Sequence, residues 1–298
     1  MESNLLNFRR LTLDDIKTVR PFLAQTQIRL CDVTVGGIFM WREFFSLQFA
    51  IWEDSLIFKA KYLNGKNAFT VPLGGDIEGA VARLADDCRA TGVPLTFCTV
   101  AEESLALLRG QFPGLTARPE TDWFDYLYRS EDLITMAGRR FSSQRNHINA
   151  MYRSYPDCHL VPIHRDNLPL AQEFLRAWHK QRQTDDPVGR EEQEKVMEVF
   201  QNYEAYGLLG GMLMADNRVA ALAAGEIVGD TLFVHIEKAD LSFPGAYQTI
   251  VREFAGYYGG NTAYINREED VGDAGLRTSK LSYHPLKLLE KYTVEVAL

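Results

Sequence analysis

An order of predicted elements that occurs twice along the chain constrains the fold more than any other feature. Alternating polar and apolar residues indicate strands, and apolar residues at helical spacing indicate helices. The first half is expected to hold strands at 46–52, 55–60 and 68–72, a helix at 77–88, a strand at 94–98, a helix at 101–109 and strands at 115–118 and 123–128. The second half is expected to hold strands at 205–214, 218–227 and 231–237, a helix at 247–254, a strand at 262–265, a helix at 273–283 and a strand at 291–297. Both halves therefore follow the order strand, strand, strand, helix, strand, helix, strand.

Corresponding elements are separated by nearly constant distances. The strands of the two triplets start about 160 residues apart, and the helix and strand that follow them start about 170 residues apart, as a duplicated domain would leave them. The alternative is two unrelated α/β halves that agree by chance. We expect a tandem domain duplication with an N-terminal domain at 1–137, a linking basic helix at 138–156 and a C-terminal domain at 157–298.

The element order also predicts the fold class. A mainly antiparallel meander followed by a helix, a strand, a helix and a strand is the order of acyltransferases of the GNAT type. We therefore expect an α/β (α+β) protein with two tandem GNAT-like domains, each a mixed, mainly antiparallel sheet flanked by helices. A further helix pair is expected at about 168–182 and 190–203.

Composition and charge restrict the class of protein. The chain has 298 residues, 46% of them hydrophobic and 24% charged, which is typical of soluble globular proteins. The net charge of −8 opposes general binding to nucleic acid or anionic lipid. The longest uncharged stretch, 254–266, falls short of the roughly 20 apolar residues that span a bilayer, so we expect no integral membrane contact.

The chain start and the cysteines indicate a cytoplasmic protein. Residues 1–4 lack the basic start of a secretory signal. The four cysteines lie far apart, without a C-x-x-C pair or a histidine at metal-ligand spacing: Cys31, Cys88, Cys98 and Cys158. We interpret them as reduced thiols of the core and expect no metal site.

A basic segment forms the first candidate site. The segment 139–153 contains four arginines and no acid, in a chain with excess acid. Arg145, Asn149 and Arg153 are four residues apart and would form one stripe of a helix. Guanidinium groups pair with phosphate oxygens in two-point geometry, so the stripe could bind phosphates. The alternative is a solvated helix face or an interdomain brace that binds backbone carbonyls of both halves.

A second candidate site lies near the C-terminus. Leu276, Lys280 and Tyr283 are four and three residues apart, so on a helix the lysine shares a face with an apolar and an aromatic side chain. A partly desolvated lysine could stabilise a developing oxyanion, but its stem could equally cover apolar surface. Three acids precede this helix and could recognise a cationic group, although its dipole alone explains them: Glu268, Glu269 and Asp270.

His235 and Glu237 form a third candidate site on a predicted central strand. They are two residues apart, so we expect both on the face opposite Leu232, Val234 and Ile236. Such a pair could relay protons or orient a substrate amine, or it could be a satisfied polar pair of the core. The G-x-S-x-G, P-loop and dinucleotide motifs are absent, which removes the usual support for hydrolase, NTPase and dehydrogenase functions.

These residues resemble a known family, the phosphatidylglycerol lysyltransferase C-terminal-domain-like proteins, which contain two GNAT-like domains and are related to Fem-type aminoacyl transferases. The resemblance covers nearly the whole chain. It is strongest at Arg145 to Asn149, at His235 to Asp240 and from Asn266 to Pro285, and it includes 32–45.

The resemblance implies transfer of an aminoacyl group from aminoacyl-tRNA to an amine or hydroxyl acceptor. Fem-type relatives use a lysine in a Leu-x-x-x-Lys-x-x-aromatic helix as oxyanion stabiliser, and Lys280 matches it. Glu237 or His235 would then lie near a soluble acceptor, and the basic segment would face the tRNA phosphates. The substrate-binding residues would be Arg145, Asn146, His147, Asn149, Asn266, Arg267, Glu268, Glu269, Asp270, Arg277 and Tyr283.

Two other functions stay open from the sequence. One is an acetyl-CoA-dependent N-acetyltransferase, which is disfavoured because the expected phosphate loop at 240–247 keeps one glycine and places Pro244 where an N–H donor is needed. The other is a non-catalytic module that binds peptide or RNA. We expect no resident cofactor, because the acyl donor is a substrate.

Overall fold

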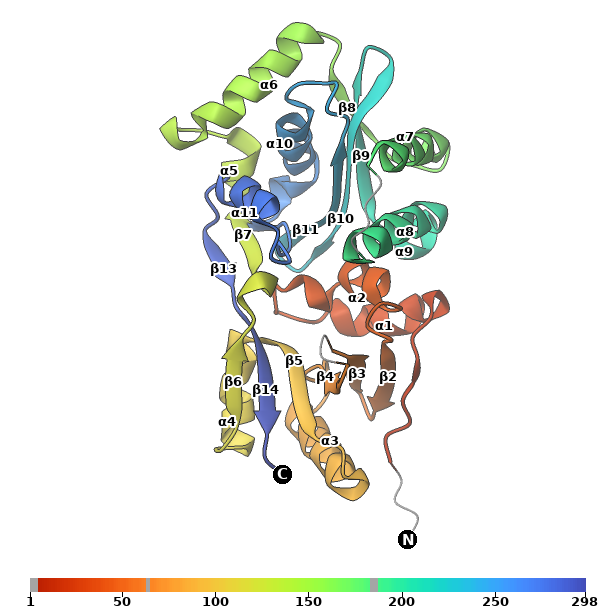
Figure 1. Cartoon of the computed structure of the whole chain (residues 1–298), viewed down its shortest axis with the longest axis vertical. Coiled ribbons are helices and arrows are strands. Elements are labelled where there is room, and N and C mark those ends of the chain that lie inside the picture. Colours follow the sequence, from red (N-terminus) through yellow and green to blue (C-terminus); the bar gives the residue numbers. More distant parts are fainter. Residues whose placement is uncertain (1–4, 63–64, 183–186) are drawn as a thin grey trace. The chain divides into compact units, whose positions relative to one another are not determined.

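The computed structural model describes residues 5–62, 65–182 and 187–298, and it divides into two compact units (Figure 1). Unit 1 comprises Met1–Asp125 and Leu289–Leu298, and unit 2 comprises Tyr126–Leu288. The start of the chain at residues 1–4, where we expect no secretory signal, lies outside the described residues.

Unit 1 is built on a seven-stranded sheet in the order β1-β2-β3-β4-β5-β14-β6. In that order the strands are β1 (Arg9–Arg10), β2 (Gln48–Trp52), β3 (Ser55–Lys61), β4 (Asn67–Phe69), β5 (Leu95–Ala101), β14 (Lys291–Val296) and β6 (Thr116–Pro119). Its α-helices are α1 (Ile16–Leu23), α2 (Val35–Trp41), α3 (Ile77–Thr91) and α4 (Glu102–Gln111), and its 3-10 turns are η1 (Leu13–Asp15), η2 (Cys31–Val33) and η3 (Thr121–Trp123).

Helix α3 shows how the sequence produces this layer. Asp76 caps its start by accepting a hydrogen bond from the Gly79 N–H at 3.0 Å, and Gly92 ends it in the left-handed conformation. Its predicted apolar stripe is buried against Phe97 and Val294 of the sheet: Ala80, Val81, Leu84, Ala85 and Cys88. The expected helix at 77–88 is therefore confirmed, and it covers one face of the sheet.

Unit 2 is built on a second seven-stranded sheet in the order β13-β7-β12-β11-β10-β9-β8. In that order the strands are β13 (Lys287–Leu289), β7 (Asp125–Arg129), β12 (Tyr264–Asn266), β11 (Thr231–Ala239), β10 (Arg218–Val228), β9 (Leu209–Ala215) and β8 (His159–Pro162). Its helices are α5 (Ser130–Thr135), η4 (Arg139–Phe141), α6 (Ser142–Ser154), α7 (Leu168–Gln181), α8 (Pro187–Gln201), α9 (Tyr203–Tyr206), α10 (Ala246–Tyr258), η5 (Gly259–Asn261) and α11 (Ala274–Leu281).

The two sheets repeat one topology. In unit 1 the antiparallel strands β2, β3 and β4 are followed by α3 and by β5, which pairs with β4 in parallel. In unit 2 the antiparallel strands β9, β10 and β11 are followed by α10 and by β12, which pairs with β11 in parallel. The expected mixed, mainly antiparallel sheets flanked by helices are confirmed.

The last strand of each repeat joins the other sheet. Strand β7 pairs with β12 in unit 2, while β14 lies between β5 and β6 in unit 1. The units therefore divide after Asp125 and before Leu289, which differs from the expected boundaries at 137 and 157. Helix α6, expected as a linker, belongs to unit 2 and packs on α10. The physical reason is that a periodic pattern reports which face of a strand is buried, but not which sheet buries it.

Candidate active site

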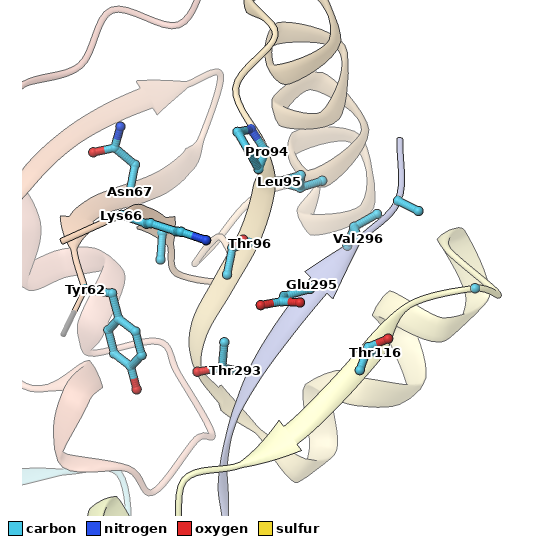
Figure 2. A pocket seen from close by; sticks show the side chains of 13 residues that line it. Tyr62, Lys66, Asn67, Pro94, Leu95, Thr96, Thr116, Thr293, Glu295 and Val296 are labelled. Carbon is cyan, nitrogen blue, oxygen red and sulfur yellow. The ribbon is translucent and has the colours of Figure 1, made fainter. Parts of the chain in front are cut away.

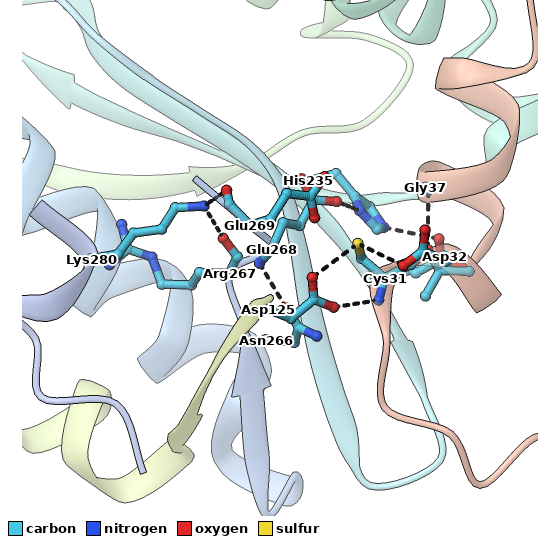
Figure 3. A network of polar contacts seen from close by, with 12 residues as sticks. Cys31, Asp32, Gly37, Asp125, His235, Asn266, Arg267, Glu268, Glu269 and Lys280 are labelled. Atoms are coloured by element: carbon cyan, nitrogen blue, oxygen red, sulfur yellow. Dashed lines mark hydrogen bonds and ion pairs between the residues drawn. The ribbon is translucent and has the colours of Figure 1, made fainter. Parts of the chain in front are cut away.

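The candidate site lies in unit 2 at the carboxyl end of the parallel pair β11 and β12. Their pairing ends at Phe233 and Asn266, yet β11 continues to Ala239 while the chain beyond Asn266 leaves the sheet and enters α11. Asp273 caps that helix by accepting a hydrogen bond from the Leu276 N–H at 2.7 Å. Polar side chains from both diverging segments fill the space between them (Figure 3).

His235 is held between two carboxylates. Its Nδ1 lies 2.7 Å from Glu268 Oε1 and its Nε2 lies 3.0 Å from Glu226 Oε1, and the imidazole is fully buried. Burial alone would lower the pKa of His235, but the hydrogen bonds to Glu226 and Glu268 outweigh it and raise the pKa to about 10. The imidazole is therefore an imidazolium at neutral pH. It links β11 to Glu226 of β10 and to Glu268 of the segment after β12.

A β-bulge in β11 separates His235 from Glu237. Val234 pairs with Gly225 and Ile236 pairs with Ala224, so His235 is the extra residue between them. Past the bulge Glu237 pairs with Ala223, a residue of the core cluster that includes Val234 and helix α10. Paired residues share a face. Glu237 therefore lies on the same face of the sheet as Val234. The expectation that His235 and Glu237 lie together on the face opposite Val234 is wrong for Glu237.

Arg267 forms the second charged contact. Its Nη2 lies 2.5 Å from Glu237 Oε2, and its guanidinium lies over the rings of Tyr283 at 4.6 Å and Tyr128 at 5.8 Å. Burial would lower the pKa of Arg267, but Glu237 raises it, so the guanidinium keeps its charge. Its Nη1 is buried and has no hydrogen-bond partner among the described residues.

Lys280 braces the turn that joins β12 to α11. Its Nζ donates to the backbone carbonyl of Arg267 at 2.6 Å and to that of Glu269 at 2.5 Å. Tyr128 in turn donates its hydroxyl to the Lys280 carbonyl at 2.8 Å. Burial lowers the pKa of Lys280. An ammonium has three N–H donors, and these two bonds use two of them.

Asp270 closes the same turn. It accepts from Arg277 Nε at 2.9 Å, from Arg277 Nη2 at 2.8 Å and from the Tyr126 hydroxyl at 2.5 Å. Burial alone would raise the pKa of Asp270, but the hydrogen bonds from Arg277 and Tyr126 lower it. The carboxylate is therefore ionised at neutral pH and fixes the start of α11.

The structure brings together most of the residues that the sequence predicts for the second and third sites. Asn266 accepts the Glu268 N–H at 2.7 Å, and this bond holds Glu268 in a left-handed conformation beside His235. The sequence reasoning missed Glu226, which completes the histidine contact. A charged residue inside the apolar strand 219–228 was the available signal for it.

The basic helix contacts the end of α11, where Gln144 Nε2 donates to the Ser282 carbonyl at 2.7 Å, but its predicted phosphate-binding residues make other contacts or are exposed. Arg145 Nη1 donates to the carbonyls of Met136 at 2.5 Å and Gly138 at 2.6 Å, so this side chain satisfies the backbone after α5 within unit 2 and is not the expected brace between the two halves. The other predicted phosphate-binding residues of α6 are exposed: Asn146, His147 and Asn149.

A compact group of potential metal ligands in unit 1 holds a lysine. Ligand atoms of Cys31, Asp32 and Asp125 lie within 4.8 Å of one another. Lys291 Nζ lies among them, 2.6 Å from Asp32 Oδ2, 2.8 Å from Asp125 Oδ1 and 3.4 Å from Cys31 Sγ. The ammonium thus supplies the positive charge there. All four cysteines are buried free thiols, and burial raises the pKa of Cys88, Cys98 and Cys158 to about 11–12.

The start of α10, where a GNAT enzyme would bind a pyrophosphate, is closed by α6. Gly245 caps this helix at φ +90°, and a Cβ built there would lie 2.2 Å from the carbonyl oxygen of His147. In unit 1 the start of α3 carries the Asp76 carboxylate on the Gly79 N–H. A helix start that is packed or already holds an anion is a poor phosphate site.

A family model described as "Phosphatidylglycerol lysyltransferase, C-terminal" matches residues 24–295. The chain belongs to this family. The match includes the diverging segments of β11 and β12 and helix α11, and it confirms the resemblance seen in the motifs.

Solved structures share the fold of this chain. A conserved protein of unknown function from Bacteroides thetaiotaomicron is 32% identical, with a TM-score of 0.89, and the match covers 98% of this chain and 100% of that one. The structure of L-PGS from Bacillus licheniformis is 12% identical, with a TM-score of 0.66 over 94% and 91% of the two chains. The FemX structure shares the fold at 9% identity, with a TM-score of 0.59 over 98% of each chain.

Family membership supports an acyltransferase in general, on a tandem GNAT-like fold. An uncharacterised protein from Mycoplasmoides gallisepticum is 23% identical over 174 residues, and the match spans 58% of this chain and 56% of that protein. Within residues 5–62, 65–182 and 187–298, no helix is both long and apolar enough to cross a bilayer.

Proposed function

We propose that the protein transfers an aminoacyl group from aminoacyl-tRNA to a soluble amine or hydroxyl acceptor in the cytoplasm, where aminoacyl-tRNA is found. The observation that carries the proposal is the half-buried ammonium of Lys280 at the diverging ends of β11 and β12. Family membership supports acyl transfer, and the lysine occupies the helix position that the family resemblance assigns to an oxyanion stabiliser.

The reaction gives Lys280 one role. The acceptor oxygen or nitrogen attacks the ester carbonyl of the aminoacyl-tRNA, and a bond forms to the carbonyl carbon as the carbonyl oxygen gains negative charge. Collapse then breaks the bond to the ribose oxygen, which takes up the proton that the acceptor loses. The third N–H of Lys280 is the donor for the oxyanion, because the first two hold Arg267 and Glu269.

The charged groups beside Lys280 suit the two substrates. Glu237 is ion-paired with Arg267 and acts on the pKa of Lys280, so this carboxylate orients the acceptor, while His235 holds Glu268 in place. The tRNA phosphates would meet the exposed side chains of α6, namely Asn146, His147 and Asn149. Acetyl-CoA is a poorer donor, because His147 closes the start of α10.

The test is a transfer assay with the full chain. Labelled aminoacyl-tRNAs and a cell extract as the source of acceptor are incubated with the wild type and with Lys280→Met. We expect transfer by the wild type and a loss of about 10²–10³-fold in rate for the variant, as for removal of one oxyanion donor. Loss of the two carbonyl bonds can also destabilise the turn, so both proteins are compared by circular dichroism and melting temperature.

Lys287→Met is the matched control, since Lys287 is an exposed lysine of the same unit. We expect it to keep full activity. Full activity of a folded Lys280→Met variant would remove the proposal, and so would the absence of deacylation or transfer by the wild type. A melting-temperature rise with acetyl-CoA would favour the acetyltransferase instead.

A further inference from the structure

A cavity in unit 1 belongs to none of the sites described above. It has a volume of about 440 Å³, within the range of about 300–1,000 Å³ that is usual for small-molecule sites. It lies over the sheet where β4, β5, β14 and β6 meet (Figure 2). The cavity is too large for a single inorganic ion, and it opens to solvent between exposed side chains.

The floor of the cavity is a polar row across three strands. Thr116 of β6 pairs with Glu295 of β14, and Glu295 pairs with Thr96 of β5, so the three side chains share one face of the sheet. Their neighbours Val294 and Phe97 face the opposite side, toward α3. This face of the sheet therefore offers two hydroxyls and a carboxylate in register.

The opposite wall carries a cation and an amide. Lys66 and Asn67 lie at the start of β4 and line the cavity. Figure 2 shows the Lys66 side chain reaching in from the β4 side and the Glu295 side chain from β14. Among the described residues, the carboxylate of Glu295 makes a long ion-pair contact of 3.8 Å with Arg118, which is itself exposed. One ligand could thus meet charges of both signs.

Thr293 supplies an independent indication of a ligand. Its side chain is buried with 4% exposure and lines the cavity, yet within the described part of the chain its Oγ1 has no hydrogen bond of good geometry, although the phenol of Tyr62 is close by. A buried hydroxyl whose hydrogen bonding is incomplete costs stability. A polar ligand atom would complete the hydrogen bonding that the Tyr62 phenol begins.

We propose that this cavity binds a small zwitterion of dipeptide size, with its carboxylate toward Lys66, its ammonium toward Glu295 and a polar atom at Thr293. A ligand with only one charge would match the charge of only one of the two walls. Both charged side chains are exposed, so solvent screens them and binding is weak and specific for the doubly charged form.

The experiment is isothermal titration calorimetry on the full chain with four probes. The probes are alanyl-alanine, its N-acetyl derivative, its C-terminal amide and the derivative blocked at both ends. We expect alanyl-alanine to bind at least about tenfold more tightly than either singly blocked probe, since a hydrogen bond to a charged group is worth that much. The doubly blocked probe should not bind.

Glu295→Gln should weaken the binding of alanyl-alanine about tenfold without changing the affinity for the N-acetyl probe, which carries only the carboxylate. Lys66→Gln should also weaken the binding of alanyl-alanine about tenfold, but without changing the affinity for the C-terminal amide, which carries only the ammonium. Thr293→Val keeps the side-chain shape, so it should weaken every probe that binds the wild type. The matched controls are Glu103→Gln and Lys17→Gln, two exposed residues of unit 1 outside the cavity. Equal affinity for the blocked and unblocked probes, or no heat for any probe at millimolar concentration, would overturn the proposal.

Discussion

At the residue scale, each unit contains a buried cation that a pair of carboxylates holds. Lys291 lies between Asp32 and Asp125, and His235 lies between Glu226 and Glu268. In both cases the charge stays buried because its partners stay close, and removal of one member leaves the others uncompensated. The two clusters make different predictions, since the pKa of the histidine is raised from 6.5 to about 10 on folding and its contribution to stability therefore depends on pH.

Replacement of Lys291 by methionine should destabilise the protein strongly. The variant would bury the carboxylates of Asp32 and Asp125 without a cation, at a cost of about 3–5 kcal/mol in the free energy of unfolding. Urea unfolding followed by circular dichroism measures this cost as a lower midpoint. Lys287→Met, on an exposed strand position, should change the free energy by less than about 0.5 kcal/mol. Equal midpoints for both variants would contradict the buried ion pairs.

His235 should make stability depend on pH. Its pKa is raised from 6.5 to about 10 in the folded state, so its contribution is complete below pH 6.5 and is lost as pH rises through 10. The total change is a few kcal/mol. Thermal unfolding from pH 6 to 9 should show the decline in the wild type.

In His235→Gln the same unfolding series should start from a lower stability and show a flatter pH dependence. His147→Gln is the control, since His147 is exposed on α6 and should keep the wild-type slope. An identical slope in His235→Gln would show that other groups carry the pH dependence.

At the scale of elements, α10 and α6 are fixed to each other by a close backbone approach. Gly245 begins α10 at φ +90°, with its Cα facing the His147 carbonyl oxygen. Only glycine adopts this conformation without strain and leaves room for that oxygen. The contact explains why the start of α10 is closed. It can be tested by a substitution that adds one methyl group at Gly245.

Gly245→Ala should lower the free energy of unfolding by about 1–3 kcal/mol, because its Cβ would lie 2.2 Å from His147 O in a strained conformation. Gly256→Ala in the same helix is the matched substitution. Nothing lies within 4 Å of its Cβ, and alanine is the better helix former, so it should raise the free energy by up to about 1 kcal/mol. Thermal melts of both variants distinguish the two effects. A gain in both would mean that the start of α10 is open.

At the scale of the whole molecule, the exchange of the last strands makes each unit depend on a segment from the other repeat. Strand β14 fills the place between β5 and β6, and its Val294 is fully buried in the core of unit 1. Strand β7 fills the corresponding place beside β12 in unit 2. Neither repeat therefore forms a complete sheet from its own consecutive residues.

A chain that ends at Glu290 should lose the structure of unit 1 but keep that of unit 2. Without β14, strands β5 and β6 have no common partner and Lys291 no longer compensates Asp32. Hydrogen exchange read by mass spectrometry should show fast exchange in 95–101 and continued protection in 218–239. Removal of residues 297–298 alone, beyond β14, should leave both patterns unchanged. Protection of 95–101 in the chain that ends at Glu290 would contradict a structural role for strand β14 in unit 1.

Periodicity predicted the elements closely, and the site only in part. The expected helix at 77–88 and strands at 55–60 and 218–227 agree with α3, β3 and β10 within a few residues, because each buries one face or stripe. The C-terminal cluster was also recognisable, since its residues are near one another in sequence. The partner of His235 was not, because Glu226 reaches it through strand pairing.

The sequence by itself determined the element order, the repeat and the residue types available to the site, because local spacing records how each segment is buried. The tertiary structure decided which sheet β7 and β14 join and which face Glu237 occupies. These depend on strand pairing over long separations and on one inserted residue at His235. A one-residue shift in register moves a side chain to the other face, and no local pattern contains that information.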